Sequence, residues 1–171
     1  MLQIRAAEKE DLERLNQIYE TAREFMRSTG NPSQWKNTNP TEKQILEDIE
    51  KSRCNVIYDE TGIHGVFALC QGEDPTYEYI EGGQWLNNEA YVTIHRIASD
   101  QTTRGIFHVA MEECKKYADN IRIDTHEDNV VMQRTLEKYD FQHCGVIYLA
   151  NGEPREAFQW AKGDATALQK V

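Results

Sequence analysis

The feature that most constrains the fold is a strand–helix–strand unit between residues 90 and 125. The apolar segment AYVTIHRIA (90–98) is followed by a polar loop, an amphipathic stretch over 104–118, and a second apolar segment, IRIDT (121–125). Strands joined through a helix run parallel, and their crossover is almost always right-handed. We therefore predict two neighbouring parallel strands with a helix packed on one face of their sheet.

Apolar periodicity and turn signals predict the rest of the fold. Three further helices begin near Glu8, Thr41 and Asn129, and two hairpins turn at residues 59–62 and 151–152. The element order is β, α, α, β, β, β, α, β, α, β, β. We expect one domain over residues 1–171, an α/β fold with a mixed, strongly twisted central sheet of about seven strands and helices on both faces.

The composition excludes several classes of function. The 171 residues carry a net charge of −10, whereas binding to nucleic acid or an anionic membrane needs clustered Lys and Arg. No apolar run approaches the ~20 residues that span a bilayer, and no apolar signal segment is present near the N-terminus. The four cysteines form no C-x-x-C pair, and the Cys/His spacing of zinc sites is missing. We expect a cytoplasmic protein with reduced cysteines and with no metal, nucleic-acid or membrane partner.

A polar, glycine-marked loop precedes the helix of the strand–helix–strand unit. Thr102, Thr103 and Arg104 offer donors suited to phosphate oxygens, and Gly105 removes a side chain where a ligand would approach the backbone. The helix N-terminus adds unpaired N–H groups and a positive dipole. The alternative interpretation of these residues is an ordinary N-cap followed by a tight turn.

The position of this loop favours an anion site. Parallel strands that separate beyond a crossover leave a cleft at their carboxyl ends, where ligands of open α/β sheets bind. Here those ends are residues 97–99 and 124–126, and Asn129 follows with an amide that both donates and accepts. We expect a pyrophosphate on the helix terminus and an extended, amide-containing arm paired with the exposed strand edge.

The loop also resembles a known motif. The acetyl-CoA motif Q/R-x-x-G-x-G/A of the GCN5-related N-acetyltransferases (the GNAT superfamily) aligns with residues 102–107. Gly105 matches a defining glycine, whereas Thr102 stands in place of the Gln or Arg and Phe107 in place of the small residue. Arg104 is positioned to supply the missing charge.

A second family signature, N-x-x-A-x-x-F-Y-x-K-x-G-F, aligns with residues 129–141. Asn129, Lys138 and Phe141 match, whereas Met132 fills the Ala position, Thr135 the Phe and Asp140 the Gly. Leu136 replaces a Tyr that many members use to protonate the departing thiolate. The element order agrees over essentially the whole chain, and several segments resemble bacterial GNAT proteins of unassigned substrate.

The resemblance implies an enzyme that moves the acetyl group of acetyl-CoA, its co-substrate, to a primary amine by direct attack in a ternary complex. A backbone N–H on the 90–98 strand, near Ile97 or Ala98, would polarise the thioester carbonyl. The residues implied to hold acetyl-CoA are Ile97, Ala98, Ser99, Arg104, Gly105, Ile106, Phe107, Asn129 and Met132.

The main candidates for acid–base catalysis are His95, Glu81 and Tyr139, and Glu78 and Tyr148 are further candidates. Strand alternation predicts that His95 shares a face with Ile97, and its ordinary pKa suits a general base. A hydrogen-bonded core histidine is the alternative for His95, and a solvated loop charge is the alternative for Glu81 and its neighbour Glu78. Tyr139 and Tyr148 are candidate acids for the thiolate, with core packing as their alternative.

Two long loops, 30–40 and 72–89, carry the aromatic residues expected to bind the acceptor. Trp35, Tyr77 and Trp85 would form walls suited to an amine, on a small molecule or a peptide. Anchoring of the loops by these rings is the alternative.

Two other functions are compatible with the sequence, and so is association with a second copy of the chain. Leu136 and the altered glycine motif are compatible with a sensor that binds acetyl-CoA without turnover. An interaction domain in which Phe107 fills the cofactor site is the third possibility. The exposed strand edges are also compatible with a homodimer.

Overall fold

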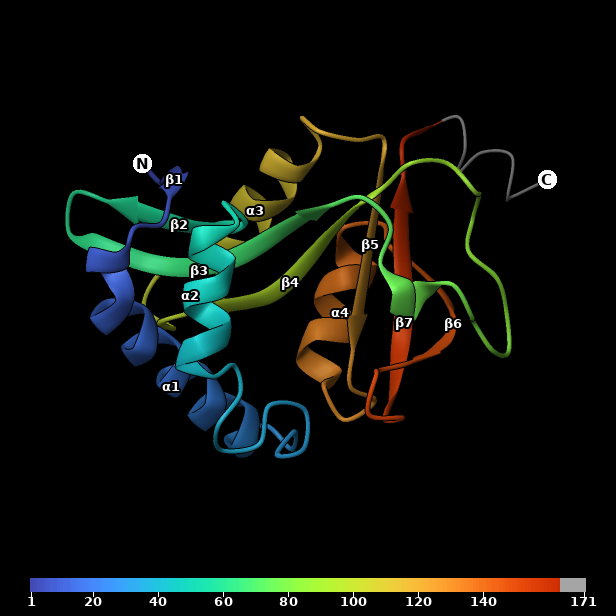
Figure 1. The fold of residues 1–171 in the computed structure, drawn as a ribbon, viewed down its shortest axis with the longest axis horizontal. Coiled ribbons are helices and arrows are strands. Elements are labelled where there is room, and N and C mark those ends of the chain that lie inside the picture. Colours follow the sequence, from blue (N-terminus) through green and yellow to red (C-terminus); the bar gives the residue numbers. More distant parts are fainter. Residues whose placement is uncertain (164–171) are drawn as a thin grey trace.

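The strands of residues 1–163, the part of the chain described in the computed structural model, form one seven-stranded sheet in the order β1-β2-β3-β4-β5-β7-β6 (Figure 1). Their bounds are Gln3–Ala6 (β1), Cys54–Asp59 (β2), Gly62–Gln71 (β3), Val92–Ser99 (β4), Asn120–Thr125 (β5), Gln142–Tyr148 (β6) and Pro154–Ala161 (β7). Only β4 and β5 pair in parallel, and every other neighbouring pair is antiparallel. The predicted mixed sheet, its parallel pair and the element order are confirmed.

Four α-helices and two 3-10 turns complete the described chain. They are η1 (Lys9–Asp11), α1 (Leu12–Ser28), α2 (Glu42–Glu50), η2 (Pro75–Tyr77), α3 (Ile106–Cys114) and α4 (Val130–Lys138). The third helix begins two residues later than predicted, because Gly105 adopts the left-handed conformation (φ +89°) that ends the preceding loop. No helix within residues 1–163 is both long enough and apolar enough to cross a bilayer.

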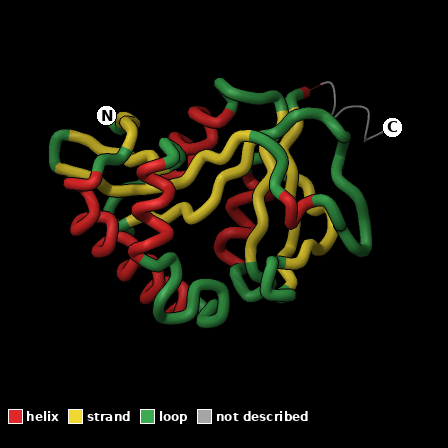
Figure 2. Tube along the Cα trace, in the orientation of Figure 1, coloured by secondary structure: helices red, strands yellow, loops and turns green. Residues whose placement is uncertain are grey.

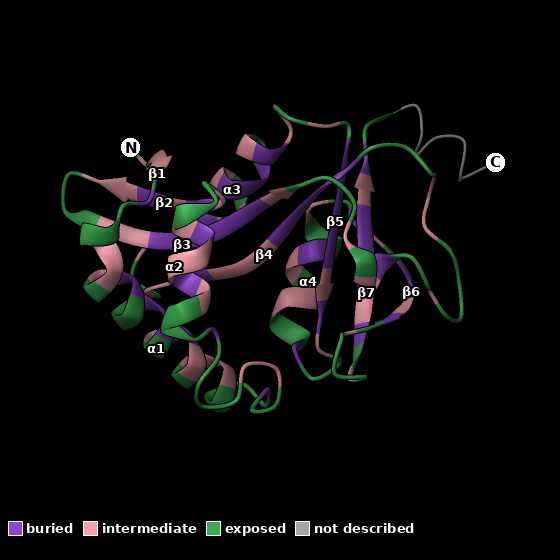
Figure 3. Cartoon of the chain, viewed as in Figure 1, coloured by how far each residue is buried: buried purple, intermediate pink, exposed green. Residues whose placement is uncertain are grey.

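The helices cover the two faces of the sheet in pairs. Side chains of α3 and α4 pack with β3, β4 and β5 in one core cluster, which includes Ile94, Ala110 and Leu136. Side chains of α1 and α2 pack in a second cluster with Cys54 of β2 and Ala98 of β4. The strands between these layers are mostly buried (Figure 3). The sheet therefore separates an α1/α2 face from an α3/α4 face.

Strand β4 contains a β-bulge. Val66 pairs with Ala98 and Ala68 pairs with His95, so one residue of β3 lies opposite two residues of β4, Arg96 and Ile97. Such an insertion reverses the alternation of side chains beyond it. His95 and Ile97 therefore do not share a face: Ile97 packs on the α3/α4 cluster, and Ala98 joins the α1/α2 cluster. The prediction that these two side chains share a face is wrong, because it assumed an unbroken strand.

Strands β4 and β5 are joined over a short ladder only. Val92 pairs with Ile121 and Thr93 with Arg122, and no pairing follows. Beyond that point β5 continues to pair with β7, through Thr125 and Glu156, whereas β4 runs toward α1 (Figure 1). The two parallel strands thus diverge toward their carboxyl ends, as the crossover topology predicts.

The long connection between β3 and β4 is a structured segment, although most of it is drawn as loop in Figure 2. Its main chain forms an isolated bridge between Glu81 and Val146 of β6. The approach is close: a Cβ on Gly83 would lie 2.0 Å from the carbonyl oxygen of Cys144. The segment is therefore fastened along the outer strand of the sheet.

Candidate active site

Two cavities open where β4 and β5 diverge. The first, here the apolar cavity, has a volume of about 210 Å³ and is lined by α1, the end of β4, the first turn of α3, and α4. The second, here the polar cavity, has a volume of about 310 Å³ and is lined by β4, β5, the 34–44 segment and the β6–β7 hairpin. Met26, Ile97, Asn129 and Met132 line both cavities. The cavities therefore meet at the bulged end of β4.

Most residues predicted to hold acetyl-CoA line the apolar cavity. They are Ile97, Ala98, Ser99, Ile106, Phe107, Asn129 and Met132. Arg104 and Gly105 lie just before this wall and are exposed. The Phe107 ring packs against Tyr139 and Phe141, with centroids 5.2 and 6.2 Å apart. Phe107 therefore forms a wall of the cavity and does not fill it.

Contacts from α1 and β3 hold the loop that precedes α3. The Asp100 carboxylate accepts hydrogen bonds from the backbone N–H and hydroxyl of Thr102 at 3.0 and 2.7 Å. Arg14 of α1 and His64 of β3 each contact the other carboxylate oxygen at 2.8 Å. Burial raises the pKa of Asp100, but the hydrogen bonds from His64 and Thr102 outweigh it and lower that pKa overall. The loop conformation is thus fixed by α1 and β3.

The bulge in β4 is held by two side chains from the α1/α2 face. Arg96 has a positive φ of +52°, which costs of order 1–3 kcal/mol for a residue other than glycine. The Tyr19 hydroxyl donates to the carbonyl of Arg96 at 2.7 Å, and Asp48 accepts two hydrogen bonds from its guanidinium at 2.7 and 2.9 Å. These contacts keep the backbone of residues 96–97 out of the regular ladder, beside both cavities.

The 34–44 segment forms one wall of the polar cavity. The Gln34 side-chain oxygen accepts from Thr125 Oγ1 at 3.2 Å and from Asn129 Nδ2 at 2.9 Å. Arg155 of β7 donates to the Gln34 carbonyl at 3.4 Å. Trp35 lines the cavity and packs edge-on against Tyr19, with centroids 5.6 Å apart. Of the three predicted acceptor-binding aromatics, Trp35 is the one that lines the polar cavity.

His95 of β4 lines the polar cavity. Its Nε2 lies 3.0 Å from Asp74 Oδ2, and no partner of its Nδ1 occurs among the residues described. Burial raises the pKa of Asp74, but hydrogen bonds from His95 and Thr76 outweigh burial and lower that pKa to about 2. The carboxylate thus fixes one ring nitrogen and leaves the other available.

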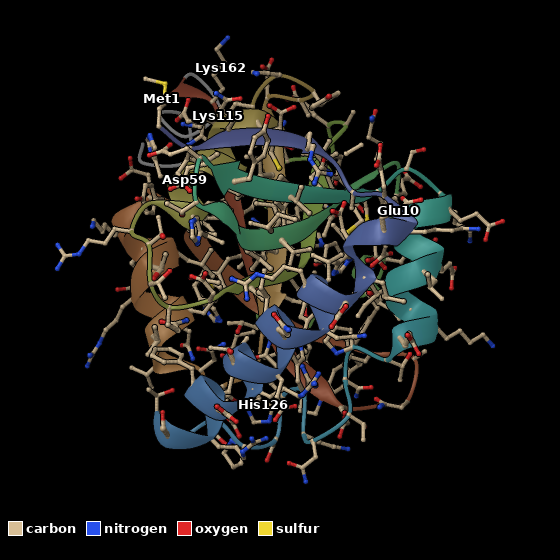
Figure 4. The ribbon with its side chains drawn as sticks, turned by 90° about the vertical axis from the view of Figure 1, so that its left-hand side faces the viewer. Met1, Glu10, Asp59, Lys115, His126 and Lys162 are labelled. Atoms are coloured by element: carbon tan, nitrogen blue, oxygen red, sulfur yellow. The ribbon has the colours of Figure 1, made fainter. Side chains whose placement is uncertain are left out.

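Asp124 lies on the opposite strand of the opening. It is the fifth residue of β5, it lines the polar cavity, and its Oδ2 accepts from the Tyr77 hydroxyl at 2.6 Å. Tyr77 is buried, and burial followed by the nearby charge of Asp124 raises its pKa well above the ordinary value. Tyr77 therefore reaches the cavity only through Asp124. In Figure 4, His126 marks this end of β5, remote from Met1 and Lys162.

The other predicted site residues lie away from both cavities. Glu81 is exposed and accepts a hydrogen bond from the Tyr148 hydroxyl. Tyr139 caps α4 and packs on Phe107 and His108. Trp85 packs on the Arg122 guanidinium at 4.2 Å and donates to the Tyr77 carbonyl at 2.9 Å. Tyr77 and Trp85 thus anchor the long segment, which is the alternative stated for them above.

Sequence reasoning missed five residues that shape the site: Gln34, Asp48, Asp74, Asp124 and Arg155. Only Asp124 carries a usable signal, because it falls at the carboxyl end of a predicted parallel strand, where ligands bind. The other four act through contacts between distant segments. Within residues 1–163, no group of three or more His, Cys, Asp or Glu side chains is arranged to hold a metal ion.

Comparisons with known proteins agree with this architecture. No protein-family model and no curated protein sequence matches the chain. Among solved structures, it is similar to a GNAT-family acetyltransferase from Streptococcus agalactiae, with a TM-score of 0.85 and 29% identity over 95% of this chain and 96% of that one. A GNAT-family acetyltransferase from Listeria monocytogenes has a TM-score of 0.68 and 19% identity over 94% of both chains.

A third solved structure was obtained with a ligand. The chain is similar to yncA from Salmonella typhimurium, solved with its cofactor acetyl-CoA, with a TM-score of 0.61 and 12% identity over 95% of both chains. The likeness to the Streptococcus agalactiae protein supports acetyl transfer as the general activity, and the other two structures share the fold. The fold of the chain is therefore that of the GNAT acetyltransferases, which it resembles over nearly its full length.

Proposed function

We propose that the protein is an N-acetyltransferase that moves the acetyl group of acetyl-CoA to a primary amine by direct attack in a ternary complex. The observation that carries the proposal is the meeting of two cavities of different chemistry at Ile97, Asn129 and Met132. An apolar cavity suits the thioester arm, and a polar cavity suits an amine. Two reactants bound from opposite sides would then react where the cavities join, which supplies much of the rate through proximity.

The apolar cavity is compatible with acetyl-CoA. Beyond Thr93, β4 has no ladder partner in β5, so backbone groups on that edge are available to the amides of the pantetheine arm. The N-terminus of α3 and the exposed Arg104 would face the pyrophosphate. Because Phe107 packs toward Tyr139, the cavity stays open where the family motif has a small residue.

The β-bulge supports a role for backbone N–H groups near Ile97. A bulge leaves its extra residue without a ladder partner. Ile97 lines both cavities, and Arg96 lines the polar one. A donor fixed at this point would stabilise the oxyanion that develops on the thioester carbonyl.

His95 is the general base of the proposed reaction. With Nε2–H donated to Asp74, Nδ1 can take a proton from the acceptor ammonium, a contribution of about 10²–10⁴ in rate. The neutral amine attacks the carbonyl, the N–C bond forms and the C–S bond breaks. The second proton of the amine passes to the leaving thiolate through water, because Leu136 is buried in the core and Tyr139 lines neither cavity.

Two measurements test the proposal in sequence. Thermal unfolding with acetyl-CoA at 100 times its Kd should show stabilisation of ~2.7 kcal/mol, or roughly 5–10 °C for a chain of this size, while AMP should give little. A screen of primary amines, read as release of free thiol, should then reveal an acceptor. Absence of a shift at millimolar acetyl-CoA would contradict the proposal.

The alternative is a sensor that binds acetyl-CoA without turnover. Its support is Leu136, which is 0% exposed and occupies the position where many family members carry the acid. A clear acetyl-CoA shift without amine-dependent thiol release would favour the sensor.

A further inference from the structure

One short helical turn contacts a side chain from each of the two diverging strands. Asp74 is the N-cap of η2 and Tyr77 is its last residue. Asp74 Oδ2 lies 3.0 Å from His95 Nε2 of β4, and the Tyr77 hydroxyl donates to Asp124 Oδ2 of β5 at 2.6 Å. One turn therefore contacts a polar side chain from each strand, beyond the point where β4 and β5 stop pairing.

The turn is itself fixed by hydrogen bonds. Asp74 Oδ1 accepts from the N–H and hydroxyl of Thr76 at 2.9 and 2.7 Å, and the Asp74 N–H donates to the Tyr91 hydroxyl at 2.8 Å. The Tyr77 side chain is only 2% exposed, and Trp85 donates to its carbonyl. The Tyr77 hydroxyl therefore has little freedom, and it fixes the direction of the Asp124 carboxylate.

Asp124 differs from the other charged side chains around the polar cavity. Arg96 is paired with Asp48 at 2.7 Å, and Arg155 with Glu153 at 3.6 Å. In contrast, Asp124 forms no ion pair within residues 1–163, and its one hydrogen-bond donor is the neutral Tyr77 hydroxyl. A carboxylate in a cavity needs a cation or several donors to offset its desolvation. A bound ammonium would provide both.

We propose that Asp124 binds the protonated acceptor amine and that Tyr77 is the positioning residue that orients its carboxylate. The inference rests on the proposed function and adds the substrate class, a primary alkylamine that arrives as a cation. His95 on the opposite strand then takes one proton from the ammonium held by Asp124. Because η2 contacts both side chains, it sets the spacing between the ammonium site and the base.

Steady-state kinetics of four variants test this inference, with an acceptor taken from the amine screen. Asp124→Asn removes the charge and keeps the shape, and Tyr77→Phe removes only the buried hydroxyl. Asp119→Asn, an exposed carboxylate beside Lys162, and Tyr58→Phe, whose hydroxyl bonds Gln3, are the matched controls. KM is measured for the amine and for acetyl-CoA, together with the melting temperature of each variant.

We expect Asp124→Asn to raise KM for the amine about 10- to 100-fold, the value of a charge-assisted hydrogen bond, with KM for acetyl-CoA within about twofold. Tyr77→Phe should raise the same KM by about 3- to 10-fold, the value of a neutral hydrogen bond. For an arylamine that is uncharged at neutral pH, KM should change little in either variant. The controls should behave as wild type.

An equal increase in KM for the amine and for acetyl-CoA would overturn the inference, because it indicates a structural role. An equal increase in KM for charged and uncharged amines would overturn it for the same reason. Wild-type kinetics for Asp124→Asn would overturn it as well. In each of these cases wild-type turnover leaves the proposed function intact. If the wild type binds acetyl-CoA but none of the primary amines tested causes release of free thiol, the proposed function is contradicted instead, and the inference with it.

Discussion

Asp48 gives the sharpest test of how the site is built. Its carboxylate is 3% exposed, bonds the guanidinium of Arg96 through both oxygens, and lies 3.0 Å from Arg53. Asp48→Asn keeps the shape of the side chain but leaves Arg96 and Arg53 without this counter-charge. The left-handed backbone of Arg96 then loses the contact that holds its side chain.

The expected loss follows from this burial. Removing one partner of a buried ion pair costs about 3–5 kcal/mol. Because the Arg96 side chain is 22% exposed, water replaces part of the lost interaction, and we expect the lower end, about 3 kcal/mol. Each kcal/mol shifts the melting temperature by about 2–4 °C in a chain of this size. Asp48→Asn should therefore melt about 6–12 °C below wild type.

Thermal melts and urea titrations measure this loss, with Glu47→Gln as the control on the same helix. Glu47 is half-exposed and pairs with Lys51 and, at 3.6 Å, with Arg53, and such surface pairs contribute less than about 1 kcal/mol. The stabilisation by acetyl-CoA should also fall in Asp48→Asn, because the bulge borders both cavities. A drop in melting temperature of less than 2 °C, or one matched by Glu47→Gln, would refute the role given to Asp48.

The remaining predictions concern catalysis, the cofactor loop and pH. His95→Gln should lower kcat by about 10²–10⁴ while leaving the acetyl-CoA thermal shift unchanged; loss of both together would indicate a structural role. Gly105→Ala forces a side chain into φ +89° and should cost about 1–2 kcal/mol of stability and weaken acetyl-CoA binding. Gly163→Ala, whose added Cβ would meet no atom of residues 1–163 within 4 Å, should change neither. Hydrogen bonding to Asp100 raises the pKa of His64 in the folded state despite burial. Its contribution to stability is therefore complete below its ordinary pKa and is lost as pH rises through the raised value. Urea titrations from pH 5 to 8 should show this decline in wild type, and an identical decline in His64→Gln would count against the assignment.

Local sequence patterns determined the element order, the parallel pair and the wall of the apolar cavity. Each of these depends on residues that are close in the chain. Ile97, Ala98 and Ser99 end one strand, and Ile106 and Phe107 begin the next helix. Once the crossover makes the strands parallel, their carboxyl ends must share one edge of the sheet. The position of the cavity wall therefore follows from topology, without knowledge of any long-range contact.

Only the tertiary structure decided the bulge and the polar cavity, because both depend on contacts between distant residues. Tyr19 lies 77 positions from Arg96, and Asp48 lies 48 positions from it. The sequence of β4 does not reveal its contacts with Tyr19 or Asp48. Regular alternation therefore assigned His95 and Ile97 to one face. The aromatic residues differ for the same reason. Trp35 borders a cavity and Trp85 packs on Arg122, and nothing in residue type or loop length distinguishes them, since the function of a loop aromatic is set by the side chain it contacts.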